Sequence, residues 1–596
     1  MTFHEVALSF ESIEKESGRL VKTTLLANLL QRATPEESAI IAYISLGVLH
    51  APHIGTQFGI AGKTVIQIMA DVLSSDYDTV SEAIKISGDE GSVLGMGAWD
   101  TNTHASTNTS SNMSVCDLYN ALQDLENLSG TGSQDRRSQV LRDLLRSLDP
   151  LAAKYVLRIV LGKLRLGFSE MTLIDALSWM VAGNKSLRDQ IERAYNVCAD
   201  IGYIAEQLKR HGISALDSLE IQVGTPIRPA AAERLPTARA IIEKLGTCVA
   251  QPKLDGFRLQ IHIDNRDTKK PSKIHFFSRN LQDMSDMFPD IVQILTNLPV
   301  KTMICEGEVV AYDPHTGIFL PFQQTVKRKR KHNIASVADE FPVKIFLFDL
   351  LYLNGESQLH KSHADRRKLL LEIIPKTTEH TDSPISVIDE KVITNAQELE
   401  TYFLQNMDAG LEGLVVKRPD SHYAAGMRNF NWIKLKRQEE GHLEDTLDCV
   451  ILGYYEGKGK RAQFGIGAFL VGVYNKTDDC FQTVAKIGTG MTDLEWKDLK
   501  KQCDAISIKH KPDQIVCSKG LYPDVWVTPK LVCMIRADEI TVSQLHSACP
   551  IIPGKSDSKC YALRFPRFMG YRDDKGPYEA TTVDEILRLY TDQFVS

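Results

Sequence analysis

Apolar and polar residues alternate with different periods along the chain. From residue 2 to about 220, apolar residues recur at i, i+3 and i+4, as in YVLRIVLGKLRLG and TLIDALSWMVAG, which predicts amphipathic helices. Runs such as FRLQIHI, MICEGEVVAY and VKIFLFDLLYL follow, with helical pieces between them, and indicate mixed α and β structure. After about residue 440 short strands dominate, for example LDCVILGYY and GAFLVGVYN, and their density favours a small barrel or sandwich.

We therefore predict a multidomain chain. The helical pattern ends at GTPIRPAAAERL, residues 224–235, where proline and glycine interrupt it. The prediction is an all-α domain at residues 1–223, an α+β domain at 224–440 and an all-β domain at 441–596. Within the first domain, residues 100–114 are almost wholly small and polar, which predicts a surface loop.

The composition is typical of a soluble globular protein, with 43% hydrophobic and 24% charged residues. We find no run of about 18 apolar residues, and the first twenty residues do not resemble a signal peptide, so we expect no membrane association. Eleven cysteines without a CxxC pair indicate free thiols in a reducing compartment. The net charge of −7 argues only weakly against a nucleic-acid partner, because only the binding surface must be positive.

The segment KLDGFR, residues 253–258, places Lys253 in a loop before a strand with one apolar and one polar face. Gly256 in this loop would let the backbone approach a ligand closely. A lysine amine attacks phosphorus only when neutral, and roughly one lysine in 2,500 is neutral at pH 7. A site that uses it must lower the pKa or remove the proton during attack. The motif alone does not decide between a nucleophile and an ordinary surface lysine in a turn.

Further motifs supply the rest of a nucleotide site. EGE at residues 306–308 lies in a strand, where a period of two puts both carboxylates on one face. WIKLK at residues 432–436 likewise puts two lysines on one face. The other elements are SRN at residues 278–280, Phe348, Glu412, Tyr423, Gly426 and Arg428. Together they offer cations for phosphates, carboxylates for a hard metal and an aromatic ring for a base.

The order KxDGxR, SRN, EGE, FLFDLLYLNGE, EGLVVK and WIKLK resembles that of the covalent nucleotidyltransferases, specifically the ATP-dependent DNA ligases of short archaeal or bacterial type. The segment from Ala152 to Leu177 resembles the ligase DNA-binding domain, and GTPIRP resembles its junction with the adenylation domain. RFPRFMGYRDDK, residues 564–575, resembles the last motif, in the OB-fold domain. The resemblance thus implies a helical DNA-binding domain, an adenylation domain and an OB-fold domain.

The resemblance also implies a role for each matching residue. Lys253 would carry AMP. The other roles are ATP contacts by Gln251, Arg258, Arg279 and Arg428, stacking on adenine by Phe348, ribose or metal binding by Glu308 and Glu412, phosphate binding by Lys434 and Lys436, and orientation of pyrophosphate by Arg572, Asp574 and Lys575. Two positions depart from the family: Gln251 stands where many relatives have Glu, and Gly570 where some have a basic residue.

The implied activity is the sealing of nicks in duplex DNA, with ATP and Mg²⁺, in DNA replication, repair and recombination. We expect a cytoplasmic monomer (nuclear if the source is eukaryotic), and a sliding clamp is a further candidate partner. Contacts to DNA should go mainly to phosphates. The basic segments that could make them are Lys154 to Arg165, Lys327 to Lys331, and Lys458 to Arg461.

Several other interpretations explain less of the sequence. A capping guanylyltransferase or an RNA ligase shares the lysine chemistry but does not account for the helical first domain. A DNA-binding scaffold would not need the lysine and the carboxylates. Use of NAD would call for a four-cysteine zinc segment, which the chain lacks. GKT at residues 62–64 does not form a P-loop, because Gln57 stands where that motif needs glycine.

Overall fold

The computed structural model describes residues 1–97, 113–267, 269–313, 318–320, 325, 328, 341–374, 383–436, 446–457, 459–549 and 560–593. The predicted loop at residues 100–114 lies almost wholly outside them. The chain divides into two compact units, Met1–Ser74 with Ala98–Arg437, and Ser75–Gly97 with Gln438–Ser596. The domain boundaries at 223/224 and 440/441 stay predictions.

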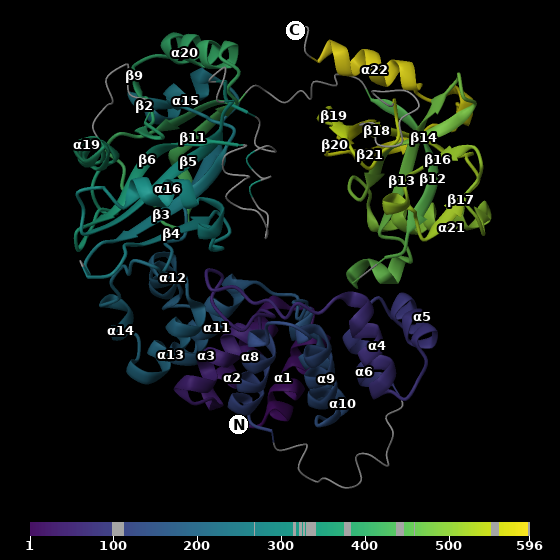
Figure 1. Cartoon of the computed structure of the whole chain (residues 1–596), viewed down its shortest axis with the longest axis horizontal. Helices are drawn as coiled ribbons and strands as arrows, with labels where there is room; N and C mark the ends of the chain where they lie inside the picture. The colour runs from purple at the N-terminus through teal and green to yellow at the C-terminus, as the bar shows by residue number, and fades with distance from the viewer. Residues whose placement is uncertain are drawn as a thin grey trace. The chain divides into compact units, whose positions relative to one another are not determined.

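The first unit begins with a helical region, as predicted (Figure 1). Two of its helices begin with a capping box, in which Thr2 and Thr34 each pair with the glutamate three positions later. Helix α1 then buries apolar residues along one face, whereas α11 is buried almost all round. The helices are α1 (Phe3–Lys15), α2 (Arg19–Arg32), α3 (Pro35–Ile44), α4 (Gly62–Val72), α8 (Val115–Asn127), α9 (Ser133–Arg146), α10 (Pro150–Val160), α11 (Glu170–Ala182), α12 (Arg188–Val197), α13 (Ile201–His211) and α14 (Ser214–Asp217).

Two sheets form the rest of the first unit. Sheet A has the order β1 (Ala231–Arg234), β11 (Arg428–Lys436), β10 (Gly413–Lys417), β2 (Cys248–Pro252) and β9 (Lys391–Ile393). Sheet B has the order β4 (Lys273–Ser278), β3 (Phe257–Asp264), β5 (Thr302–Ala311), β6 (Val343–Leu353) and β7 (Glu356–Ser357), and β8 (Ile385–Val387) pairs with β6. The helices of this region are α15 (Ala238–Leu245), α16 (Pro289–Leu295), α19 (His363–Ile373), α20 (Ala396–Asp408) and the 3-10 turn η2 (Ser285–Met287).

Each sheet buries one apolar face under its own helices. Ile241 of α15 and Leu399 of α20 pack with Ile433 of sheet A, whereas Ile291 of α16 packs with Ile261 of sheet B. The chain passes from sheet A to sheet B between β2 and β3. Lys253 lies in this crossing segment, so both sheets can supply side chains around it.

The second unit holds the strand-rich C-terminal region (Figure 1). Its main sheet runs β15 (Ser507–Ile508), β17 (Val525–Val527), β12 (Leu447–Tyr455), β13 (Ala468–Asn475), β14 (Cys480–Ile487) and β16 (Ile515–Val516), with β18 (Val532–Arg536) joining β12 to β21 (Arg567–Tyr571), while β19 (Glu539–Ser543) pairs with β20 (Cys560–Arg564). The unit also holds α5 (Tyr77–Ser87), α6 (Glu90–Met96), α21 (Asp493–Ala505), α22 (Val583–Asp592), and the 3-10 turns η3 (Gly459–Phe464), η4 (Lys519–Leu521) and η5 (Pro577–Glu579).

Two further expectations concern the whole chain. All eleven cysteines are free thiols, as predicted. Within the described ranges, no helix has the length and apolar character needed to cross a membrane.

Candidate active site

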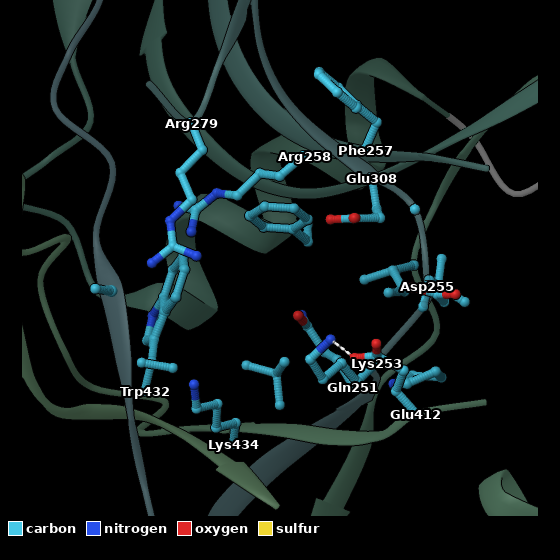
Figure 2. Close-up of a pocket in the computed structure, with 18 of the residues that line it drawn as sticks. Gln251, Lys253, Asp255, Phe257, Arg258, Arg279, Glu308, Glu412, Trp432 and Lys434 are labelled. Carbon is cyan, nitrogen blue, oxygen red and sulfur yellow. Dashed lines mark hydrogen bonds and ion pairs between the residues drawn. The ribbon is translucent and has the colours of Figure 1, made fainter. Parts of the chain in front are cut away.

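Lys253 lies in a cavity of about 620 Å³ between sheets A and B (Figure 2). Side chains of β3, β5 and the turn after β4 face those of β2, β10 and β11 across it, and the latter include Lys434. The residues of the first unit that were predicted to carry AMP or to bind ATP or metal all line this cavity: Gln251, Lys253, Arg258, Arg279, Glu308, Phe348, Glu412, Arg428, Lys434 and Lys436. Glu306, Tyr423 and Gly426 do not line it. The structure therefore brings together positions up to 185 residues apart in sequence, from Gln251 to Lys436.

The backbone sets Glu412 opposite Lys253. The pairing of β2 with β10 continues one step past the strands, because the N–H of Lys253 donates to the carbonyl of Gly413 (2.8 Å) and the N–H of Glu412 to the carbonyl of Lys253 (3.1 Å). Gly413 permits this arrangement: its φ is +136°, and a Cβ there would lie 2.2 Å from the carbonyl oxygen of Leu435. The register thus puts a carboxylate beside the amine.

Glu412 forms ion pairs with two lysines. Its carboxylate contacts Nζ of Lys253 (Figure 2, dashed) and lies 3.1 Å from Nζ of Lys436. Burial alone would raise the pKa of Glu412, but the two ammonium groups outweigh it and hold the pKa below its usual value. The three side chains keep between 24% and 31% of their exposure, so solvent or a ligand can reach this end of the cavity.

Sheet B contributes two carboxylates with different surroundings. Nη2 of Arg258 lies 2.8 and 3.0 Å from the two oxygens of Glu306, and the hydroxyl of Tyr423 donates to Glu306 (2.8 Å). Glu308, directly across the strand pair from Arg258, faces the cavity. Burial raises the pKa of Glu308 to about 7, although Lys253 and Arg258 oppose that rise. The carboxylate of Glu306 is thus paired with Arg258, whereas the carboxylate of Glu308 lies where a ligand in the cavity can contact it.

An aromatic and cationic cluster occupies another end of the cavity. The rings of Phe348 and Trp432 meet edge to face with centroids 6.0 Å apart. Nζ of Lys417 lies 4.2 Å from the Trp432 ring centroid and donates to the Phe348 carbonyl (3.0 Å). Burial lowers the pKa of Lys417 to about 8, and Asp349 opposes that fall. This end suits a flat, uncharged ring such as a nucleobase.

Behind this cluster lies a buried polar network. The Arg366 guanidinium bonds Asp349 through Nε (2.6 Å) and Nη2 (3.1 Å), and both side chains are fully buried. Nε2 of Gln251 donates to Glu390 (2.8 Å), which also accepts from Nε2 of His363 (2.8 Å). The network thus connects Gln251, which lines the cavity, to charged side chains that are largely or fully buried.

The remaining predicted cations, Arg279, Arg428, Lys434 and Lys436, line the same cavity. Lys434 and Lys436 share one face of β11, and burial with the neighbouring cations Lys436, Arg428 and Arg279 lowers the pKa of Lys434. Mutual repulsion among these groups is what an anionic ligand would relieve. The cluster therefore favours a polyphosphate.

Some residues of the site were missed by sequence reasoning. Glu306 stood in the quoted EGE motif, and Lys417 ended the quoted EGLVVK motif, but neither was given a role. Trp432 was likewise quoted without one. Glu390 lies in the segment VIDEK between two short strands, and no spacing or motif distinguished it.

The last predicted motif belongs to the second unit. Asp448 of β12 accepts from both Arg572 (3.1 Å) and Lys575 (2.6 Å), and Arg572 also pairs with Asp574 (2.8 Å). These side chains therefore neutralise one another within the unit. The backbone of Gly570 has a φ of +159°, which is extended.

The predicted basic segments differ in what they can offer to DNA. Arg158 is 2% exposed and bonds Glu14, and Lys154 also pairs with Glu14 (2.9 Å), whereas Lys163 is exposed. Arg328 is buried against Asp290 (2.7 Å), and Lys327 with Lys329–Lys331 lies outside the described residues. Arg461 donates to the carbonyls of Gly467 and Gly488, and the neighbouring basic side chains lie outside the description.

Comparisons with known proteins match the chain along its length. Three family models fit: "DNA ligase N terminus" at residues 2–178, "ATP dependent DNA ligase domain" at 229–436 and "ATP dependent DNA ligase C terminal region" at 462–575. The chain is 43% identical to a "Probable DNA ligase" of Dictyoglomus thermophilum, over 100% of this chain and 98% of that protein. It is 36% identical to a "DNA ligase" of Sulfolobus acidocaldarius, over 99% and 98%. The solved structure Pmar-Lig_PreS3 aligns with a TM-score of 0.55 at 17% identity, over 95% of this chain and 99% of that one, and so shares the fold.

Proposed function

The chain belongs to the family of ATP-dependent DNA ligases, and from this premise we propose that it seals nicks in duplex DNA through a covalent lysine–AMP intermediate. The observation that carries the proposal is the position of the Lys253 amine. It lies beside a carboxylate in a cavity that cations and aromatic rings also line. A nucleophile, phosphate ligands and a base site therefore occupy one cavity.

In the first step the Nζ lone pair of Lys253 attacks the α-phosphorus of ATP. A P–N bond forms, the bond from that phosphorus to the α,β-bridging oxygen breaks, and pyrophosphate leaves with the bonding electrons. The amine must lose its proton for the attack. Lys434 and Lys436 hold the phosphates, and Phe348 stacks on the adenine.

Two further transfers complete the reaction. An oxygen of the 5′-phosphate at the nick attacks the phosphorus of the lysine-bound AMP, and Lys253 leaves as the amine. The 3′-hydroxyl then attacks the 5′-phosphate, loses its proton, and expels AMP. The chemistry is dominated by in-line positioning and by stabilisation of negative charge rather than by acid or base groups.

Glu308 and Glu412 would hold the metal ion. Two carboxylates that face a polyphosphate site fit Mg²⁺, which proteins usually bind through one or two carboxylates together with phosphates and waters. The ion would neutralise charge on the reacting phosphates. Glu412, which would hold the ion together with Glu308, also contacts the Lys253 amine, so it lies beside both the nucleophile and the phosphates.

The remaining parts of the proposal concern partners and location. Nicked duplex DNA is the substrate, and the contacts go to phosphates. We propose a cytoplasmic monomer that acts in replication, repair and recombination, with a sliding clamp as a further candidate partner.

Incubation of the protein with α-labelled ATP and magnesium, followed by a denaturing gel, tests the first step. A labelled band at the mass of the chain is expected, and pyrophosphate should remove it by reversing the reaction. Addition of a duplex with a single nick should discharge the label and give a sealed strand. Labelling with GTP in preference to ATP, or sealing of RNA alone, would contradict the proposal.

A further inference from the structure

The side-chain amide of Gln251 is held in one orientation by the carboxylate of Glu390. Gln251 lies on β2, is 2% exposed, and lines the cavity beside Ile388, which precedes Glu390 by two residues. Its Nε2 donates to Oε2 of Glu390 at 2.8 Å. No hydrogen bond to Oε1 of Gln251 is formed by the described residues, so this oxygen and the second N–H of the amide remain for a ligand.

The ionisation of Glu390 fixes which way the amide points. Burial tends to raise the pKa of Glu390, but His363 and Arg367 outweigh it and hold the pKa below its usual value. His363 donates to Oε2, and Arg367 lies 3.2 Å from Oε1. An ionised carboxylate only accepts hydrogen bonds, so the amide must turn its NH₂ group to Glu390. The reverse orientation would place two acceptors in contact without a proton between them.

A fixed amide can distinguish purines by the group at position 6. Adenine has an amine there, next to an acceptor ring nitrogen, and a glutamine amide pairs with this order of donor and acceptor. Hypoxanthine and guanine carry a carbonyl at that position, which would face the amide oxygen unless the amide flipped. Phe348 and Trp432 line the same cavity and bind any purine through its ring, so they cannot make this distinction.

We propose that Glu390 is a positioning residue that selects adenine over 6-oxopurine nucleotides by fixing the orientation of the Gln251 amide. The proposal rests on the proposed function, since it concerns the base of the nucleotide that Lys253 attacks. A glutamate at 251 would meet Glu390 as a second carboxylate, so Gln251 and Glu390 form a matched pair in this chain.

The test compares α-labelled ATP and ITP as donors to the full-length protein with magnesium, and measures kcat/KM for formation of the labelled enzyme. In Glu390→Gln the partner can itself turn, so both orientations of Gln251 become available. The preference for ATP over ITP should fall by about tenfold to a hundredfold, the discrimination that one bidentate pair supplies. Because the readout is a ratio, a smaller folded fraction does not change it.

Two further variants separate positioning from general damage. Gln251→Glu alone places two carboxylates in contact and should react slowly with both nucleotides, and the double variant Gln251→Glu, Glu390→Gln should recover most of the rate of labelling with ATP, because one carboxylate again faces one amide. Glu243→Gln makes the same substitution at an exposed glutamate outside the cavity and should keep the wild-type ratio. An unchanged ratio in Glu390→Gln, a double variant no better than Gln251→Glu, or an equal loss in Glu243→Gln would overturn the proposal. A wild-type chain labelled by neither nucleotide would contradict the proposed function instead.

Discussion

The two ends of the cavity handle charge in opposite ways. At the amine end, Lys253, Glu412 and Lys436 keep about a quarter to a third of their exposure and form ion pairs that a ligand can replace. At the base end, Asp349 and Arg366 are fully buried and bond each other directly. A triphosphate can therefore pair with the charges at the amine end, whereas the charges at the base end already pair with each other.

This difference indicates where binding changes the site and where it does not. A polyphosphate relieves the repulsion among the cations around Lys434, so binding and chemistry draw on the same electrostatic imbalance. The base end instead offers a fixed shape and a fixed hydrogen-bonding edge. We expect substitutions at the amine end to alter rates, and substitutions at the base end to alter stability and selectivity.

The largest expected effect is at Lys253. Lys253→Ala should abolish transfer of AMP to the protein, because no other lysine holds the KxDGxR context. The same variant should still seal a nick that already carries a 5′-adenylate, since the final step does not use the amine. Gel assays with labelled ATP and with a pre-adenylated nick measure both activities. A variant that still becomes labelled would remove Lys253 from the mechanism.

Asp349 should show the largest effect on stability. Burial alone would raise its pKa, but Arg366, His363 and Lys417 hold the pKa well below its usual range, so the carboxylate stabilises the fold at neutral pH. Asp349→Ala leaves Arg366 buried without its partner and should lower the free energy of unfolding by about 3–5 kcal/mol.

Urea unfolding of the ligand-free protein measures this loss. The matched control is the exposed pair of Arg239 and Glu243, 2.9 Å apart with side chains 86% and 65% exposed. Glu243→Ala should change stability by less than about 1 kcal/mol. Similar losses of unfolding free energy in the two variants would show that the buried pair stabilises the fold no more than the exposed pair does.

Glu412→Ala should act mainly on the rate. Its carboxylate contacts two lysines and faces the proposed metal, so its loss disturbs both the nucleophile and the phosphates. We expect single-turnover sealing at saturating magnesium to slow by at least a hundredfold, which corresponds to about 2.7 kcal/mol in the barrier. Sealing at the wild-type rate would refute a direct role for Glu412.

Removal of the Glu308 carboxylate should raise the free energy of unfolding, whereas removal of the Asp349 carboxylate should lower it. The Glu308 pKa of about 7 in the folded state lies above the unfolded value, so the folded protein loses stability as pH rises from about 4.5 to 7. Glu308→Gln removes this cost. It should raise the free energy of unfolding at pH 8 by about 2 kcal/mol, and at pH 5 by much less. Denaturation at the two pH values without magnesium provides the measurement. Equal effects at both would mean that Glu308 does not titrate in this range.

The sequence predicted the residues that contact a ligand better than the residues that support them. Residues that must meet a ligand, such as Lys253 and Glu308, stand in short motifs with a readable chemical purpose, and all of those predicted in the first unit line the cavity. Residues that serve other residues, such as Glu390 and Arg366, carry no local signal, because their partners lie far away in the chain.

Arg158 illustrates the same limit outside the cavity. It lies in the basic segment Lys154 to Arg165, whose spacing spreads the cations around the helix so that only some can face DNA, and tertiary packing turns Arg158 inward to Glu14. The helical first region and the strands of the later regions were predictable from periodicity, because burial of one face needs only local pattern. The pairing of individual charges was not, since it depends on which elements meet in space.

The smallest expected effect concerns Lys163, and it extends the comparison from the cavity to the surface. Lys163 follows α10 and is exposed, whereas Lys154 on α10 already pairs with Glu14 at 2.9 Å. A lysine that neutralises one DNA phosphate contributes about 0.9 to the slope of log affinity against log salt. Lys163→Ala should therefore reduce the slope measured with a nicked duplex by about this amount, and Lys154→Ala by clearly less. Titrations at several salt concentrations compare the two variants directly. If Lys154→Ala changed the slope as much as Lys163→Ala, the ion pair with Glu14 would not prevent Lys154 from contacting a DNA phosphate. The distinction between charges paired within the protein and charges open to a ligand would then not apply to this surface.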